Sequence, residues 1–137
     1  MAPRFLLDTN ICIYIRRRRP PEVLTHFLQI DAGDAVVSVV TYGELVNGMV
    51  KQHSPLLARA LEQLDEFASL VRVMPLPIEA GKRYGEIRSA LESKGQIIGG
   101  NDLWIAAHAI SADLTLVTNN EREFRRIPAL KIANWSK

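Results

Sequence analysis

Five short apolar runs, separated by segments with helical spacing, dominate the pattern of this sequence. The runs cover residues 5–7, 35–40, 71–74, 114–117 and 130–133 and are rich in Leu, Ile and Val. Between them, apolar residues recur every three or four positions, which is the spacing of one face of a helix. Strands that are short and apolar throughout, with helices between them, predict an α/β fold in which a small parallel sheet is covered on both faces.

The helical spacing predicts seven helices around this sheet. They are expected over about residues 11–14, 23–28, 42–49, 57–67, 78–94, 103–112 and 121–125. Gly43 and Gly48 interrupt the third of these helices. Because glycine weakens a helix by roughly 1 kcal/mol relative to alanine, we expect close packing against these two positions.

Length and composition predict one folded domain over residues 1–137. The chain has 137 residues, of which 47% are hydrophobic and 23% charged, and it contains no internal repeat or linker. These values exclude the disordered and collagen-like classes. The single cysteine, Cys12, excludes an intramolecular disulfide framework and is expected in the core. With no signal-peptide pattern and no long apolar run, we expect a soluble cytoplasmic protein without membrane contact.

Acidic side chains recur where the predicted strands end and helices begin. Asp8 ends the first strand, Glu44 follows the second, Asp102 begins the helix before the fourth, and Glu123 follows the fourth. In a parallel sheet, the carboxyl ends of the strands meet at one edge. The four acids are therefore expected to converge. Taken singly, each has an ordinary alternative: Asp8 and Asp102 as helix caps, Glu44 and Glu123 as solvated helix residues.

Convergence of several carboxylates favours a bound divalent cation. Like charges within a few ångströms oppose one another, and a cation removes the conflict. His26, His53 and His108 lie in separate segments without ligand spacing, so the donors favour a hard ion, Mg²⁺ or Mn²⁺. Such an ion activates water and stabilises a phosphate undergoing displacement, which predicts phosphodiester hydrolysis.

Neutral polar residues occur at the same strand ends. We expect these side chains to orient the acidic ligands or the attacking water; they are Asn10, Thr118 and Asn120, with Asn119 beside the last two.

The basic residues are grouped, although the net charge is only +2. Both groups are open to two interpretations, a solvated basic surface or phosphate contacts to RNA. The candidate RNA-binding residues are Arg16, Arg17, Arg18, Arg19, Arg122 and Arg125, with Arg126 beside them. Tyr14, Tyr42 and Trp104 are similarly open between base stacking and a place in the core or a dimer interface.

Four blocks of the sequence resemble the PIN-domain ribonucleases, and within them the VapC-type toxins of bacterial toxin–antitoxin pairs. The resemblance covers nearly the whole chain. It is carried by FLLDTNICIYI at 5–15, SVVTYGELVNGM at 38–49, GGNDLWIAAHA at 99–109 and LVTNNEREFRRIPALKIANW at 116–135. It implies a three-layer α/β/α PIN-like fold with a short central parallel sheet, usually in a homodimer.

The resemblance also implies roles for the acidic residues. Asp8, Glu44 and Asp102 match the acidic metal ligands of the family, which use Mg²⁺ or Mn²⁺. Many relatives have Asp where this chain has the neutral Asn120. We therefore assign Glu123 as the fourth acid, with Asn120 and Thr118 as supporting polar groups.

The implied function is that of an endoribonuclease toxin that cuts structured RNA such as tRNA and blocks translation. A VapB-type antitoxin would hold it inactive, form a higher assembly with it, and supply all contact with operator DNA. Two alternatives stay open. In the first, the chain is an aspartyl-phosphate signalling module that uses Asp8. In the second, it is a catalytically silent module that binds RNA or a partner.

Overall fold

A parallel β-sheet lies at the centre of the computed structural model, which describes residues 2–137. Within that range the sheet has five strands in the spatial order β3-β2-β1-β4-β5, and every neighbouring pair is parallel. The strands are β1 (Phe5–Leu7), β2 (Ala35–Ser38), β3 (Val73–Met74), β4 (Thr115–Val117) and β5 (Ile132–Ala133). β1 is therefore the central strand, with β2 and β4 on either side of it, and β3 and β5 form the two edges of the sheet.

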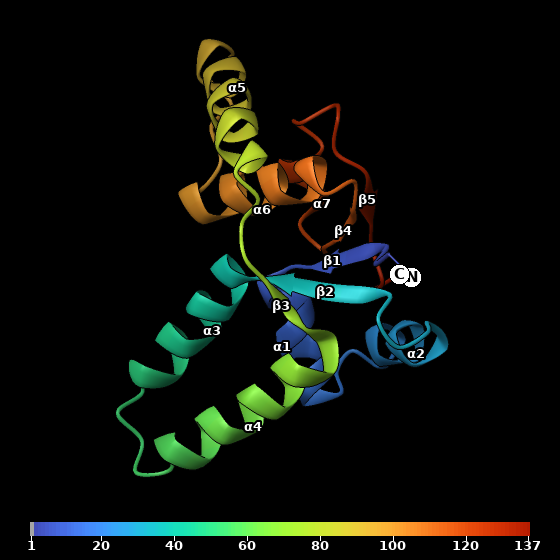
Figure 1. Cartoon of the computed structure of the whole chain (residues 1–137), viewed down its shortest axis with the longest axis vertical. Coiled ribbons are helices and arrows are strands. Elements are labelled where there is room, and N and C mark those ends of the chain that lie inside the picture. The colour runs from blue at the N-terminus through green and yellow to red at the C-terminus, as the bar shows by residue number, and fades with distance from the viewer. Residues whose placement is uncertain (1) are drawn as a thin grey trace.

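Helices cover both faces of this sheet. Their bounds are α1 (Thr9–Arg17), α2 (Pro21–Gln29), α3 (Val39–Val50), α4 (Leu57–Val71), α5 (Glu79–Ser93), α6 (Gly100–Ser111) and α7 (Glu121–Phe124). In Figure 1, α5, α6 and α7 lie on one side of the strands, and α1, α2 and α4 lie on the other. The predicted three-layer α/β/α architecture is confirmed.

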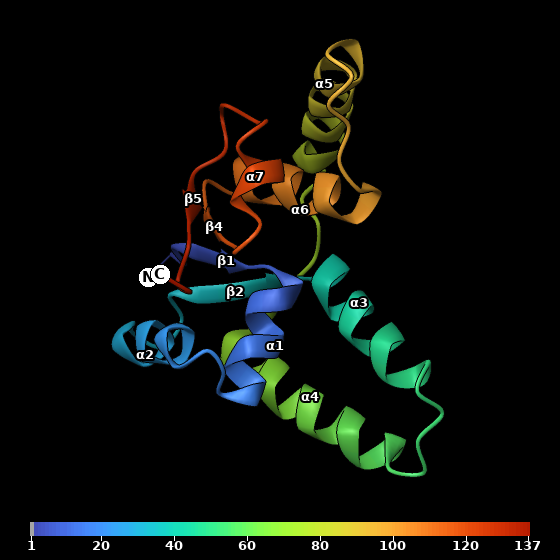
Figure 2. The ribbon, with the colours of Figure 1, turned by 180° about the vertical axis from the view of Figure 1, so that it is seen from behind.

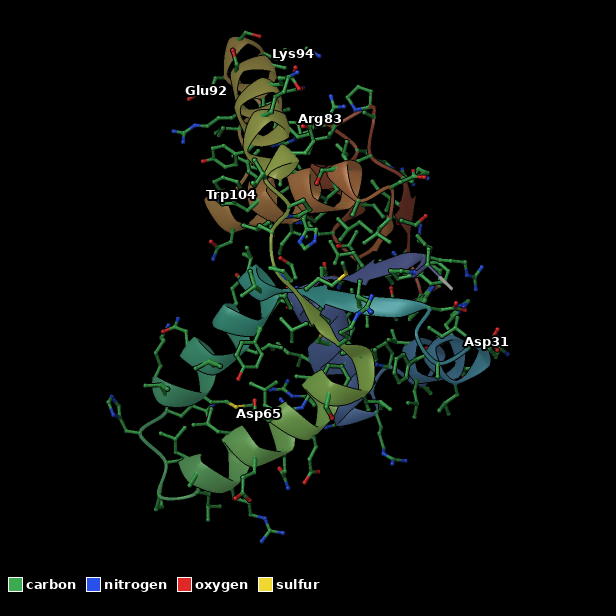
Figure 3. All side chains as sticks on the ribbon, viewed as in Figure 1. Asp31, Asp65, Arg83, Glu92, Lys94 and Trp104 are labelled. Atoms are coloured by element: carbon green, nitrogen blue, oxygen red, sulfur yellow. The ribbon has the colours of Figure 1, made fainter. Side chains whose placement is uncertain are left out.

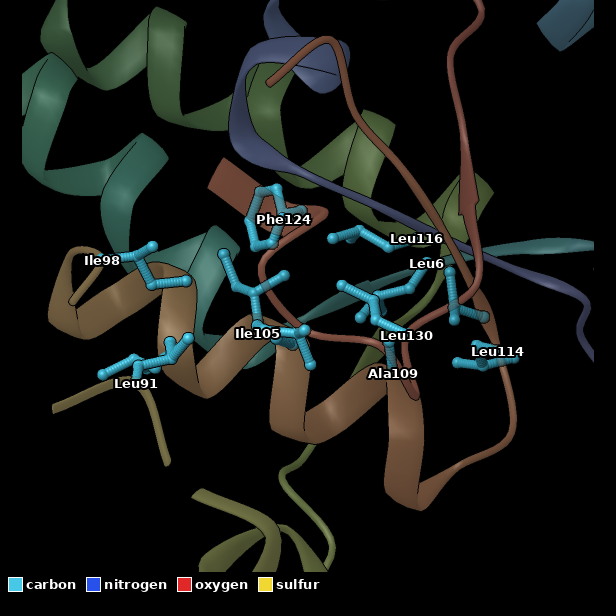
Figure 4. Packing of buried hydrophobic residues seen from close by; sticks show 13 residues of the cluster. Leu6, Leu91, Ile98, Ile105, Ala109, Leu114, Leu116, Phe124 and Leu130 are labelled. Carbon is cyan, nitrogen blue, oxygen red and sulfur yellow. The ribbon is translucent and has the colours of Figure 1, made fainter. Parts of the chain in front are cut away.

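Alternating side chains of the short strands build two separate cores. Leu6 and Leu116 pack with Ile105 and Ala109 on the α6 side of the sheet, as the close view in Figure 4 shows. The adjacent Leu7 packs on the opposite side, in the cluster that contains Leu64 of α4. Because successive strand residues point to opposite faces, strands of a few residues serve both cores. Each fully buried Leu or Ile contributes about 1.5–3 kcal/mol to folding, so the central strands are held firmly.

The second strand is shorter than the sequence predicts. Residues 35–40 were expected to be one strand, but β2 ends at Ser38 and α3 begins at Val39. The Ser38 hydroxyl accepts a hydrogen bond from the Val40 N–H, with an N···O distance of 3.1 Å. This cap satisfies a donor at the start of the helix and outweighs the preference of two valines for a strand.

Two smaller expectations also differ from the structure. Val71 ends α4 instead of starting the third strand, and the chain turns at Arg72, which has a left-handed φ of 59°. The close packing expected at Gly43 and Gly48 is wrong, because both glycines are exposed and a Cβ at either would meet no atom within 4 Å. Cys12 is fully buried, as predicted.

Among residues 2–137, no helix is both long enough and apolar enough to cross a membrane.

Candidate active site

Asp8 lies at the carboxyl end of β1 and caps α1. Its Oδ1 accepts a hydrogen bond from the backbone N–H of Ile11, with an N···O distance of 2.9 Å. The residue is only 6% exposed. Burial raises the pKa of Asp8 to about 6; the Thr118 side chain and the Ile11 N–H lower it, and the nearby carboxylates of Asp102 and Glu44 raise it. Asp8 is therefore a helix cap and also a member of an acidic cluster.

Glu44 reaches this cluster from the helix that follows β2. It lies on α3 and is half-buried. The Thr9 hydroxyl donates a hydrogen bond to Glu44 Oε1, with an O···O distance of 2.6 Å. Thr9 is the first residue of α1 and follows Asp8 directly. One hydrogen bond thus fixes the Glu44 carboxylate to the helix that Asp8 caps.

Asp102 enters the cluster from the first turn of α6. The helix begins at Gly100 with Gly99 as its cap, so Asp102 is not the cap residue that its sequence position also allowed. Burial raises the pKa of Asp102 to about 6, and the carboxylates of Glu44 and Glu123 raise it as well. Charges have this effect over only a few ångströms. Asp8, Glu44 and Asp102, which come from three different elements, therefore lie near one another, and Glu123 of α7 lies near Asp102.

A hollow opens beside these acids. It has a volume of about 420 Å³ and is lined by Glu44, Gly99, Gly100, Asn101 and Asp102. The N-terminus of α6 contributes a partial positive charge at this hollow, which favours an approaching anion. Phosphate oxygens and water would thus have access to the carboxylates of Glu44 and Asp102.

The donors in this cluster fit a hydrated hard cation. Within residues 2–137, no group of three or more His, Cys, Asp or Glu side chains lies close enough to ligate one ion directly. Mg²⁺ commonly binds through one or two carboxylates and keeps several of its waters, so such a set suits it. Raised pKa values at Asp8 and Asp102 fit the same conclusion, because a cation would remove the repulsion that helps to raise them.

The three supporting polar residues lie differently with respect to the cluster. Thr118 is fully buried directly after β4, and its hydroxyl accepts a hydrogen bond from the Asn120 N–H at 2.9 Å. Asn120 is half-buried at the start of α7. Asn10 is exposed on α1, and within the described range no hydrogen bond links its side chain to the four acids. Thr118 therefore has the most direct contact with the site.

Three polar contacts near the site were not foreseen from the sequence. One is the Thr9 bond to Glu44. The second is a hydrogen bond of 2.8 Å from Asn119 Nδ2 to the Tyr14 hydroxyl. The third joins the fully buried His108 to Ser38, with Nδ1 and Oγ 2.9 Å apart. The role of Thr9 could have been suspected, because it is a polar residue next to the predicted site acid Asp8. No local feature of the sequence indicated that His108 pairs with the distant Ser38.

The arginines divide into free and engaged side chains. In the described part of the chain, no ion pair involves Arg16, Arg17, Arg18, Arg19 or Arg122; Arg16 is half-buried and the other four are exposed.

The arginines after Glu123 already have partners. Arg125 pairs with Glu121 at 3.0 Å, and Arg126 donates to the backbone oxygens of Gln96 and Ile97. Among the candidate RNA-binding arginines of the described residues, those without an ion pair are therefore the four around the end of α1 and Arg122 on α7.

Of the three aromatic residues singled out, none is free of protein contacts. Trp104 stacks on Tyr84, with ring centroids 4.0 Å apart, and Figure 3 shows it between α6 and α5. The Tyr42 hydroxyl donates to Asp65 at 2.6 Å, and Tyr14 accepts from Asn119. These contacts favour the structural interpretation of all three side chains.

Comparison with known proteins agrees with this fold. The PIN domain family profile matches residues 5–130. Ribonuclease VapC2 of Haemophilus influenzae is 41% identical over 132 residues, which cover 96% of this chain and 98% of the relative. The tRNA(fMet)-specific endonuclease VapC of Shigella flexneri is 38% identical and covers 97% and 98% of the two chains. The chain belongs to the PIN-domain family and, within it, to the VapC ribonucleases.

Solved structures give the same result for the backbone. The toxin chain of DNA-bound VapBC from Salmonella typhimurium superposes with a TM-score of 0.88 at 36% identity, covering 97% of this chain and 98% of that one. VapBC-1 from nontypeable Haemophilus influenzae gives a TM-score of 0.87 at 33% identity with the same coverage.

Proposed function

We propose that this chain is a metal-dependent endoribonuclease toxin that hydrolyses phosphodiester bonds in structured RNA, tRNA in particular, and thereby blocks translation. The observation that carries the proposal is the convergence of Asp8, Glu44, Asp102 and Glu123 beside an open hollow. A cluster of one buried and several half-buried carboxylates opposes folding through mutual repulsion, and a hard cation removes that repulsion. Membership of a ribonuclease family supports RNA as the substrate class.

Each residue of the cluster has a role in this proposal. Asp8, Glu44 and Asp102 would hold Mg²⁺ or Mn²⁺, one or two of them directly and the rest through waters of the ion, because no three such side chains within residues 2–137 lie close enough to ligate it together. When bound there, the ion would supply a water of lowered pKa and would compensate negative charge on the phosphate. Glu123, which lies near Asp102, orients a water molecule. No side chain of the protein acts as a nucleophile.

Neutral groups complete the site in the same proposal. The Thr118 hydroxyl stabilises the Asp8 carboxylate and orders the backbone at Asn120. Asn10, which is exposed, and Asn120, which is half-buried, contact the substrate or ordered water through their amides. Arg16, Arg17 and Arg122, free of ion pairs within residues 2–137, attract the RNA backbone.

Relatives support tRNA as the substrate and an antitoxin as the partner. The names of the proteins from Shigella flexneri and Salmonella typhimurium state specificity for tRNA(fMet). Several structural relatives are VapBC complexes, and those from Rickettsia felis and Salmonella typhimurium are bound to DNA. We infer that this chain forms a homodimer in the cytoplasm, joins a VapB-type antitoxin in a larger assembly, and reaches operator DNA only through that antitoxin.

RNA cleavage by the purified protein, freed from antitoxin, tests the proposal. Total RNA is incubated with the wild type in Mg²⁺, in Mn²⁺ and in EDTA, beside the Asp8→Asn and Asp102→Asn variants. We expect metal-dependent cleavage by the wild type alone, and sequencing of the new 5′ ends names the cut site. Equal cleavage by wild type and variants, or cleavage in EDTA, contradicts the mechanism.

The same preparation separates the alternatives. An aspartyl-phosphate module would become labelled at Asp8 by a small phosphodonor, whereas the nuclease forms no covalent intermediate. A silent binding module would retain RNA without cutting it. Expression in bacteria should arrest growth, and Asp8→Ala should relieve the arrest.

A further inference from the structure

A cavity of about 300 Å³ lies between α1 and α3, next to the acidic cluster but distinct from the hollow at α6. Figure 2 shows the two helices leaving the edge of the sheet side by side and then diverging. Thr9 and Glu44, joined by their hydrogen bond, form the end of the cavity nearest the site. Because Glu44 lines both spaces, the cavity continues directly from the place where a scissile phosphate would lie.

The walls of the cavity are apolar on one side and basic at the far end. Ile13, Leu45 and Met49 supply its apolar surface. Arg16 and Arg17 line it away from the acids, and neither forms an ion pair within residues 2–137. An apolar surface that ends at unpaired cations matches a ligand with a flat ring at one end and an anion at the other.

We propose that this cavity holds one unpaired nucleotide of the RNA substrate, adjacent to the scissile phosphate. The base lies against Ile13, Leu45 and Met49, and its phosphate contacts Arg16 and Arg17. The volume suits one nucleotide, since pockets that hold small ligands begin at about 300 Å³. The assignment rests on the proposed ribonuclease function and adds to it a requirement for unpaired RNA at the cut.

The chain offers a matched pair of substitutions to test the cavity. Gly48 lines it, is exposed and helical, and would place a side chain into open space without meeting an atom within 4 Å of its Cβ. Gly48→Leu should therefore fill the cavity and keep the fold. Gly43 is equally exposed and helical on α3 but does not line the cavity, so Gly43→Leu controls for helix stabilisation.

The probe is a short fluorescein-labelled single-stranded RNA of mixed sequence, bound in EDTA so that no cleavage occurs. Gly48→Leu should weaken binding at least about fivefold, because its side chain takes the place of the base, and Gly43→Leu should bind the RNA like the wild type. Arg17→Ala should reduce the slope of log affinity against log salt by about 0.7, as expected for one phosphate contact. Arg59→Ala, an exposed arginine on α4, should leave the slope unchanged. Mn²⁺ affinity should be the same in all four variants.

Cleavage in Mg²⁺ keeps this proposal separate from the proposed function. If the wild type does not cleave any RNA, the proposed function fails, while the binding measurement in EDTA still decides on the cavity. If Gly48→Leu and Arg17→Ala bind the RNA like the wild type, the nucleotide assignment is overturned. Loss of antitoxin binding by these variants with RNA binding intact would overturn it too, and would assign the cavity to the antitoxin.

Discussion

Thr9 and Glu44 lie on different helices, and a hydrogen bond of 2.6 Å from Thr9 Oγ1 to Glu44 Oε1 joins them. Thr9 follows Asp8 in the chain, so the same backbone turn orients one site acid and fixes another. A carboxylate held in one rotamer before a ligand arrives loses less entropy when it binds. The hydroxyl of Thr9 is therefore expected to position Glu44 for a cation.

Thr9→Val keeps the shape of the side chain but removes the hydroxyl. We expect Mn²⁺ affinity, measured by calorimetry, to fall about tenfold to a hundredfold, as for other groups that orient metal ligands. The cleavage activity of this variant should fall mainly because a higher metal concentration is needed to reach it. Thr9→Ser retains the hydroxyl and should restore both quantities. If the Val and Ser variants bind Mn²⁺ equally well, the positioning role is wrong.

Asp8→Asn should stabilise the metal-free protein while abolishing cleavage. Asparagine also caps helices, so the bond from Ile11 is retained. The substitution removes a buried charge whose pKa is raised to about 6, which is worth on the order of 3 kcal/mol at neutral pH. Chemical denaturation in EDTA measures the difference in free energy of unfolding. A less stable, inactive variant would indicate simple damage to the fold.

The stability difference between the wild type and Asp8→Asn should depend on pH. Between its usual pKa of 3.8 and the folded value of about 6, Asp8 binds its proton more tightly in the folded state than in the unfolded state. Its cost to stability is therefore fully present above pH 6 and disappears as the pH falls towards 3.8. Denaturation curves at several pH values should show the two proteins converging in acid. A difference in unfolding free energy that does not change with pH would mean that folding does not shift the pKa of Asp8.

Glu123 and Glu121 on α7 form a matched pair for testing the fourth acid. Glu123 faces Asp102 and raises its pKa. Glu121 instead bonds Lys137 and Asn134, which, with Arg125, hold its pKa at about 2. Glu123→Gln should lower the cleavage rate about tenfold to a hundredfold, less than loss of Asp102, and Glu121→Gln should leave it unchanged. Equal cleavage rates in the two variants would mean that Glu123 is not part of the active site.

Ser38 links two elements that carry site acids. Its hydroxyl caps α3, which bears Glu44, and lies 2.9 Å from Nδ1 of His108 on α6, which bears Asp102. Ser38→Ala should destabilise the fold by about 2–3 kcal/mol, because it removes a cap and leaves a buried imidazole nitrogen unpaired. Ser54 makes a similar local bond at an exposed position, so Ser54→Ala should cost about 1 kcal/mol or less. Thermal unfolding compares the two.

Short-range patterns in the sequence were sufficient to predict most of this fold. The strand-length apolar runs and the three-to-four spacing located every helix and strand of the described residues, because each helix buries one face and each strand is covered on both faces. The errors in secondary structure fell at the boundaries of elements. At one of them, a single hydroxyl decides where the helix begins. Ser38 converts two valines from strand to helix by capping α3, and β-branched composition alone predicts the opposite.

The acids of the candidate site were predictable because topology, and not sequence proximity, brings them together. Strand ends in a parallel sheet share one edge, so Asp8, Glu44, Asp102 and Glu123 could be grouped before any coordinates. Their hydrogen-bond partners were not predictable in this way. The bonds of Thr9 to Glu44 and of Ser38 to His108 depend on how two helices pack, to within a fraction of an ångström.

Mn²⁺ titration followed by electron paramagnetic resonance tests the central claim most directly, because it counts the bound ion without requiring a substrate. The wild type should bind Mn²⁺, Mg²⁺ should displace it, and Asp8→Asn or Asp102→Asn should weaken binding by at least about tenfold. Binding of Mn²⁺ that is equally strong in both variants and the wild type would contradict the account.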